Sequence, residues 1–314
     1  LASLVLPACN VFNKSADQAG AAKPGAPLPQ SGMEIIRGDF SYSNDFVFET
    51  YYVEHAAAIC DMTGFILRDM EWELPVVSQV LGFMEVDKDN NRGSYRLQLP
   101  VRPAGELNDV NPDGKKETGV QVFAACYSPN LTGGPFSEGD DRSMGWPSYM
   151  ASVKTDSENQ DEVIGGKLLV WAPDGGQMFP SSFGDDGLLF TKDDPVASLP
   201  AGYSIVDLDK KPFEVSQPVE GDLPLYEPSD VALKDYSALT YREAFDKMFE
   251  NIRKEYAFNG VEGKEPDWDS LYAKLSPRVD QAQAAGDAEA FFAVIQDYTF
   301  AFHDGHVGAG SELA

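Results

Sequence analysis

The chain has 314 residues, of which 43% are hydrophobic and 11% aromatic, a composition typical of a globular protein of about two domains and not of a disordered segment. Acidic residues outnumber basic ones by 51 to 24, so the formal net charge is −27. A surface of this charge repels nucleic acid phosphates and anionic membranes, and we therefore expect no nucleic-acid partner.

The first residues resemble the end of a bacterial lipoprotein signal. Residues 1–9 run from an apolar segment to Cys9, as in a lipoprotein cleavage box, although Pro7 stands where such a box prefers a small or branched residue. Residues 10–33 are rich in Ala, Gly, Pro and Ser and predict a flexible tether. We expect an exported protein, held on the outer face of a bacterial membrane by a lipid on Cys9. An apolar N-terminus with a chance cysteine is the alternative.

Residues 34–218 predict a β-rich domain, because segments of strand length alternate with clusters of Gly, Pro, Asn and Asp. The segments are residues 46–53, 79–86, 94–99, 119–127, 167–171 and 203–208. With little helical periodicity between them, they favour a β-sandwich. The following residues, 219–237, come directly after Pro218, contain Pro224 and Pro228, and predict a linker.

Two cysteines of this region form a possible pair. If Cys9 carries the lipid, Cys60 and Cys126 remain, and in an oxidising compartment they would form one disulfide. Two buried free thiols are the alternative.

One loop of the β-rich region has the spacing of a calcium loop. Asp109, Asn111 and Asp113 supply oxygen atoms at positions 1, 3 and 5, Gly114 stands at position 6 and Glu117 at position 9. Position 12 is a valine, which excludes a complete EF-hand. A structural calcium ion would need a distant carboxylate, for which the candidates are Asp185, Asp186, Asp193 and Asp194. The alternative is that these residues only form turns.

Residues 238–314 predict three helices. Thr240 and Glu243 form a capping box at the start of the first, whose apolar residues recur at helical spacing. A second, short helix begins at Asp267 and is expected to stop before Pro277, and a third begins near Asp287. The whole chain is therefore expected to be α+β, with a β-sandwich-like domain followed by a small three-helix segment.

The third helix runs into the sequence Phe-His-Asp-Gly-His-Val, where Gly305 is expected to end the helix. Residues 235–310 resemble the N-terminal helical segment of the tail-specific (C-terminal processing) serine peptidases, and more closely their tricorn-like branch. The residues that carry the resemblance are Asp267-Trp268 before the second helix and Asp304-Gly305-His306 after the third.

The resemblance implies a role for His306. In the tricorn-like branch the histidine of this motif looks like the base that activates a serine much later in the chain, whereas in the processing branch a Ser–Lys pair does this work. The family's catalytic domain has no counterpart in these 314 residues, so the chain by itself is expected to be inactive. The resemblance implies a peptide or unfolded protein as substrate and no cofactor for catalysis.

Other interpretations of the same residues remain open. His306 would also serve to cap the third helix by hydrogen bonding to nearby carbonyl groups. His303, Asp304 and His306 would make half of a metal site, but the sequence offers no third-ligand pattern to complete it. For the whole protein, the alternative to a peptidase is a calcium-stabilised surface lipoprotein that binds peptide or glycan through its β-domain.

Overall fold

The computed structural model describes residues 33–44, 56–68, 79–128, 150–156, 162–229 and 232–310. The chain divides into two compact units, Leu1–Ala232 and Leu233–Ala314. Strands predominate in the first unit and the long helices α3, α4 and α5 make up the second, which confirms the predicted α+β class.

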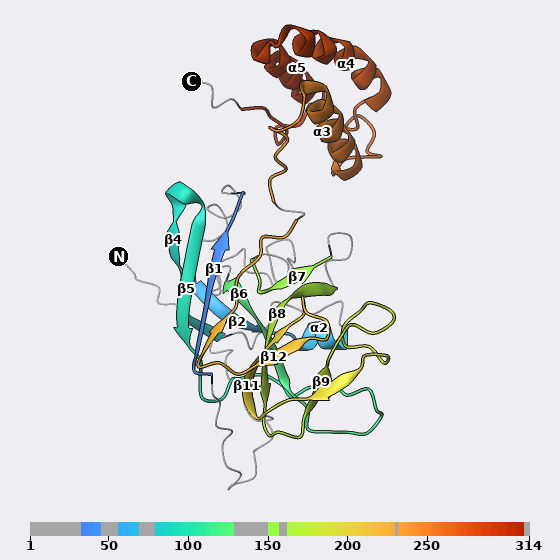
Figure 1. Ribbon diagram of the computed structural model, residues 1–314. Coiled ribbons are helices and arrows are strands. Elements are labelled where there is room, and N and C mark those ends of the chain that lie inside the picture. Colours follow the sequence, from blue (N-terminus) through green and yellow to red (C-terminus); the bar gives the residue numbers. More distant parts are fainter. Residues whose placement is uncertain are drawn as a thin grey trace, which may run out of the picture. The chain divides into compact units, whose positions relative to one another are not determined.

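A four-stranded sheet forms one layer of the first unit (Figure 1). Its order is β13 (Glu220–Asp222), β1 (Ile35–Ser41), β5 (Arg92–Gln98) and β4 (Glu85–Asp87). β1 pairs with β5 in antiparallel register along its whole length and with β13 in parallel register. The short 3₁₀ helix η1 (Lys88–Asn90) and the left-handed Asn91 make the turn between β4 and β5.

A seven-stranded antiparallel sheet forms the second layer. Its path runs β12 (Glu214–Ser216), β11 (Gly202–Asp207), β8 (Val163–Ala172), β6 (Gln121–Ser128), β2 (Ala56–Asp61) and β3 (Gln79–Phe83), and β7 (Val153–Thr155) pairs with the start of β8. The helix α2 (Thr63–Leu67) follows β2, and β9 (Met178–Pro180) pairs with β10 (Val196–Ser198).

The two sheets enclose one hydrophobic core. Because side chains alternate along a strand, Phe40 of β1 meets Phe123 and Trp171 of the larger sheet in this core. The opposite face of the larger sheet buries a second core, in which Val122 and Val170 pack with side chains from α2 and β9. The predicted β-sandwich-like domain is therefore present, with both faces of its larger sheet covered.

Most predicted strands are found near their expected positions. β5, β6, β8 and β11 correspond to the segments 94–99, 119–127, 167–171 and 203–208. The predicted strand 79–86 is two strands, because β3 belongs to the larger sheet and β4 to the smaller one. The predicted strand 46–53 lies outside the described residues.

The predicted linker, residues 219–237, begins too early. Residues 220–222 form β13 beside β1, and Leu223 and Leu225 are buried in the core between the sheets. The prolines of this segment, Pro224 and Pro228, do not prevent pairing, because they follow β13 and lie outside it. At the other end, Met33 closes the predicted tether but is only 1% exposed and belongs to the same core.

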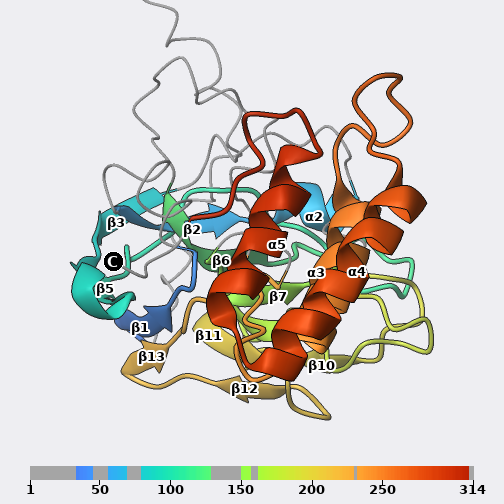
Figure 2. The ribbon, with the colours of Figure 1, turned by 90° about the horizontal axis from the view of Figure 1, so that it is seen from above.

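Three helices form the second unit: α3 (Tyr241–Glu255), α4 (Trp268–Ala285) and α5 (Ala288–Phe300). α4 packs against both α3 and α5 (Figure 2). The predicted caps are present: Thr240 and Glu243 form the capping box, and Asp267 and Asp287 accept hydrogen bonds from backbone N–H groups of the first turns of α4 and α5.

The expected end of the second helix before Pro277 is wrong, because α4 continues to Ala285. A proline inside a helix removes one hydrogen bond and costs about 3 kcal/mol. This cost is offset by burial on both sides of Pro277, where Leu275 and Val279 are fully buried in the helical core. Tertiary packing therefore overrides the local preference of proline.

Aromatic rings fill the core of the helical unit. Phe249 lies at its centre, with ring centroids 5.7 Å from Trp268, 5.1 Å from Tyr272 and 5.5 Å from Tyr298. These rings come from all three helices, and their largely edge-on or tilted arrangement is the one that aromatic side chains prefer.

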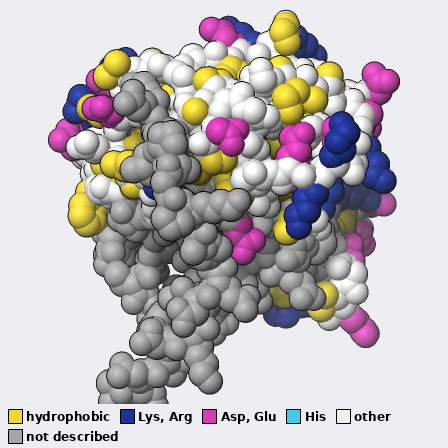
Figure 3. All heavy atoms as spheres, turned by 90° about the horizontal axis from the view of Figure 1, so that it is seen from below, with side chains coloured by type: hydrophobic (Ala, Val, Ile, Leu, Met, Phe, Trp, Pro, Cys, Tyr) yellow, Lys and Arg dark blue, Asp and Glu magenta, His cyan; other side chains and the backbone are white. Residues whose placement is uncertain are grey.

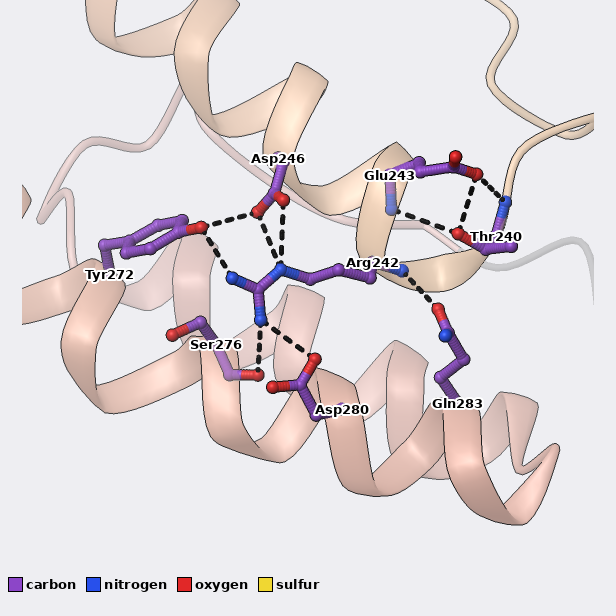
Figure 4. Close-up of polar contacts among 8 residues, drawn as sticks. All are labelled: Thr240, Arg242, Glu243, Asp246, Tyr272, Ser276, Asp280 and Gln283. Atoms are coloured by element: carbon purple, nitrogen blue, oxygen red, sulfur yellow. Dashed lines mark hydrogen bonds and ion pairs between the residues drawn. The ribbon is translucent and has the colours of Figure 1, made fainter.

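Arg242 joins α3 to α4 through a fork of hydrogen bonds (Figure 4). Its Nε donates to Asp246 on its own helix, while its Nη1 and Nη2 reach Asp280 at 2.9 Å and the Tyr272 hydroxyl at 2.8 Å. Nη1 also donates to the carbonyl of Ser276, just before the helix proline. The neighbouring carboxylates raise the pKa of Arg242, so the guanidinium stays charged.

Charged side chains are distributed over the surface of the molecule seen in Figure 3. On this face acidic side chains lie apart from one another, with Lys and Arg side chains and single apolar residues among them. Some of the charges are paired in the first unit, as in the contacts of Arg37 and Arg96 with Glu220 at 3.4 and 3.3 Å. On the part of this face that is not drawn in grey, the acidic side chains are therefore not gathered in one cluster.

Candidate functional site

The segment that follows α5 carries His306. α5 ends at Phe300, five residues before Gly305, so the expectation that Gly305 ends the helix is wrong. The left-handed residue of this segment is His303, with φ of 50°. The chain turns here because Phe302 is fully buried among Tyr256, Trp268 and Tyr298, which anchors the start of the segment on the helical core.

Asp304 and His306 form a hydrogen-bonded pair. Oδ1 of Asp304 accepts from the backbone N–H of His306 at 3.0 Å and lies 2.9 Å from its Nδ1. Oδ2 of Asp304 accepts from the hydroxyl of Tyr256 at 3.3 Å. The Asp304 side chain is 9% exposed, whereas that of His306 is 96% exposed. The pair thus has a covered carboxylate and an open imidazole.

Hydrogen bonding also affects the protonation of these groups. The backbone N–H of His306, followed by its imidazole, lowers the pKa of Asp304, so the carboxylate is ionised at neutral pH. Burial, followed by the charge of Asp304, raises the pKa of Tyr256, so its hydroxyl keeps its proton.

This arrangement has the chemistry of a general base. With the proton of the neutral imidazole on Nδ1, facing Asp304, Nε2 carries the lone pair and is open to a reactant. A carboxylate that holds the base and stabilises its protonated form is the third member of serine hydrolase triads. Within the described part of the chain, His306 makes no hydrogen bond to a Ser, Thr or Cys side chain.

The other two histidines are His303 and His55. His303 is exposed, and His55 lies outside the described residues. Among the residues that the structure describes, no group of three His, Cys, Asp or Glu side chains is placed to hold a metal ion.

The predicted calcium loop closes on its own hydrogen bonds. The Asp109 carboxylate accepts from the backbone N–H groups of Asn111 and Glu117 at 3.2 and 2.7 Å. The Asn111 amide donates to Glu117, and Asp113 accepts from the backbone and the ammonium group of Lys115. Backbone and side-chain donors therefore hold these oxygen atoms within the turn. Calcium binding stays a prediction.

The distant carboxylates proposed for that ion have a different role in the structure. Asp193 accepts from the backbone N–H groups of Asp185 and Asp186, and Asp194 accepts from those of Gly184 and Thr191. Asp194 is 4% exposed, and burial raises its pKa. The buried Asp194 and the exposed Asp193 thus hold the loop 183–195 together through backbone hydrogen bonds.

Cys60 and Cys126 are joined by a disulfide, with their Cα atoms 6.4 Å apart. They lie on the neighbouring strands β2 and β6, two residues out of direct register, since Ala58 stands opposite Cys126. Cys9 lies outside the described residues.

A groove of about 910 Å³ lies at the end of the smaller sheet. Its lining comes from β4, from the adjoining ends of β1 and β5, and from residues 224–226. Three carboxylates and one guanidinium contribute to it, together with an aromatic ring: Asp39, Glu85, Asp87, Arg92 and Tyr226. The volume lies within the range of small-molecule and peptide pockets.

Sequence reasoning missed Tyr256 as part of the His306 site. Tyr256 continues the apolar periodicity of α3, which predicts only a core residue. Its ring does pack on the core, but its hydroxyl points to Asp304, 48 residues further along the chain. A contact between residues this far apart cannot be predicted from a local sequence pattern.

The chain matches no protein-family model, no curated protein and no solved structure. In the described residues, no helix has both the length and the apolar character needed to span a membrane.

Proposed function

We propose that residues 233–310 are the helical segment of an exported serine peptidase of the tail-specific family, with His306 as its general base. The observation that carries this proposal is the pair of Asp304 and His306, in which the carboxylate is covered and Nε2 is open. The pair stands at the Asp-Gly-His motif on which the resemblance to the tricorn-like branch depends.

The proposed reaction is hydrolysis of a peptide bond by acyl transfer. Nε2 of His306 removes the proton of a serine hydroxyl as its oxygen attacks the peptide carbonyl, and the imidazolium then gives that proton to the leaving amine. Water hydrolyses the acyl-enzyme in a second step with the same base. Asp304 stabilises the imidazolium through Nδ1. The serine would come from outside these 314 residues, in a catalytic domain.

The disulfide supports the proposed export, because structural disulfides persist mainly in oxidising compartments. We place the protein on the outer face of a bacterial membrane, anchored through Cys9 and residues 10–33. The substrate would be a peptide or an unfolded protein.

The test is labelling of the protein expressed from its complete gene with a serine-reactive phosphonate probe. We expect the wild type and His303→Ala to be labelled and His306→Ala to lose labelling by two orders of magnitude or more. Labelling that survives in His306→Ala would show that another residue is the general base, as in a Ser–Lys mechanism. A complete gene without a catalytic serine, and a product without labelling, would refute the peptidase proposal.

A second candidate function is a surface lipoprotein that binds peptide or glycan through its β-domain, stabilised by calcium. The groove at the end of the smaller sheet favours it, because its carboxylates and Tyr226 suit hydrogen bonding and ring contacts to either ligand. Peptide and oligosaccharide arrays probed with the chain would test it, with Glu85→Lys as the groove variant. Binding lost in Glu85→Lys would support this function, and an unbound wild type would contradict it. A calcium titration followed by the melting temperature would test the ion.

A further inference from the structure

Tyr256 stands where three parts of the helical unit meet. It is the C-cap residue of α3, and its backbone N–H donates to the carbonyl of Ile252. Its ring lies edge-on to Phe302 at 5.0 Å and to Trp268 at 6.2 Å. Because α3, the start of α4 and the segment after α5 all contact this ring, its hydroxyl has a defined position beside Asp304.

The orientation of His306 depends on Asp304. In the described residues, the backbone N–H and Nδ1 of His306 both lie within hydrogen-bond distance of Oδ1 of Asp304, and the imidazole is otherwise exposed to solvent. The rotation of a carboxylate about its Cβ–Cγ bond is only weakly restricted by its own chain. The backbone N–H of His306 holds Oδ1 from one side, and the Tyr256 hydroxyl restricts the rotation further by donating to Oδ2.

The charges of Tyr256, Asp304 and His306 favour the hydrogen bonds that link them. Among the described residues, hydrogen bonds from His306 and Tyr256 lower the pKa of Asp304, and the charge of Asp304 contributes to the raised pKa of Tyr256. A protonated phenol from α3 thus donates to an ionised carboxylate, which accepts from the imidazole.

We propose that Tyr256 is a positioning residue for His306. Its hydroxyl orients the Asp304 carboxylate so that the neutral imidazole carries its proton on Nδ1 and leaves Nε2 free. The inference rests on the proposed role of His306 as a base, since this is the tautomer that a base acting through Nε2 requires.

The test is nitrogen NMR of the full 314-residue chain labelled with ¹⁵N-histidine, at a pH where the imidazole is neutral. The chain has three histidines, and His306→Gln assigns the signals of His306. We expect the Nδ1–H tautomer in the wild type. In Tyr256→Phe the ratio of the Nδ1–H to the Nε2–H tautomer should fall about twofold to tenfold, the range for loss of one hydrogen bond. Phenylalanine keeps the ring and its packing.

Tyr272→Phe is the matched control. It removes another tyrosine hydroxyl of the same unit, bonded to Asp246 at 2.8 Å, and leaves Asp304 untouched. We expect wild-type tautomer signals for His306 in this variant and the Nε2–H form in Asp304→Asn. An unchanged ratio in Tyr256→Phe, or an equal change in Tyr272→Phe, would overturn the inference. A shifted ratio together with phosphonate labelling that survives His306→Ala would keep the positioning contact and refute only the proposed base.

Discussion

Phe249 is the side chain whose removal should damage the helical unit most. It is 4% exposed, and its ring contacts aromatic rings from its own helix, from α4 and from α5. Phe249→Ala removes these contacts and leaves a cavity at the centre of the unit. The helices can close such a cavity only partly, because the other rings that line it are themselves packed against one another.

The expected loss in the free energy of unfolding is about 3–5 kcal/mol, the range for a buried phenylalanine replaced by alanine. A unit of about 80 residues has a total stability of roughly 4–12 kcal/mol. The substitution therefore removes a large share of the stability of the helical unit, and it would unfold a unit whose stability lies at the lower end of this range.

Hydrogen exchange followed by mass spectrometry measures this change locally, in peptides from α3, α4 and α5. A loss of 3–5 kcal/mol corresponds to exchange about a hundredfold to several thousandfold faster, because each 1.4 kcal/mol is a factor of ten. The cap box, the helix proline and the salt bridges remain unchanged in this variant, so the measurement isolates the aromatic core.

Phe300→Ala is the matched control, since this phenylalanine is 74% exposed at the end of α5. Its effect should stay within about 0.5 kcal/mol, or roughly twofold in exchange rate. Equal effects of the two substitutions would refute the assignment of the core to Phe249 and its neighbours.

Three further predictions concern the contacts of Arg242, the disulfide and the Asp304 carboxylate. Arg242→Met should destabilise the helical unit by about 1–2 kcal/mol. This is less than the loss of a buried salt bridge, because the guanidinium and its partners are partly exposed. An unchanged hydrogen exchange rate in α3 and α4 would contradict this prediction. Replacing both Cys60 and Cys126 by alanine should lower the stability of the β unit by about 4 kcal/mol, given their separation of 66 residues. In the unreduced, denatured 314-residue chain, only the thiol of Cys9 should titrate, and three titratable thiols would exclude the disulfide. Asp304 has a folded pKa below its unfolded value of about 3.9, so its stabilising effect is present above that pH and is lost as the pH falls through the folded pKa. Relative to the intrinsic amide exchange rate at each pH, the protection of residues 301–307 should fall with acid in the wild type, and Asp304→Asn should remove this dependence.

Local patterns predicted much of this fold. The capping box and the N-cap aspartates identify the starts of α3, α4 and α5, because the donors they satisfy lie within three residues of the cap. Alternation and β-branched composition likewise predict β5, β6, β8 and β11. The position of Asp304 and His306 after the third helix, two residues apart, is also a local property of the chain.

Other features were decided by the tertiary structure alone. In these, contacts between residues far apart in the sequence override or complete the local patterns. α4 continues through Pro277 because buried neighbours on both sides outweigh a lost hydrogen bond. Residues 220–222 become a strand because β1 offers a free edge nearly 190 residues earlier. The contact of Tyr256 with Asp304 also depends on residues far apart in the sequence. The packing of three helices brings the hydroxyl to the carboxylate, and no pattern within any one helix predicts it.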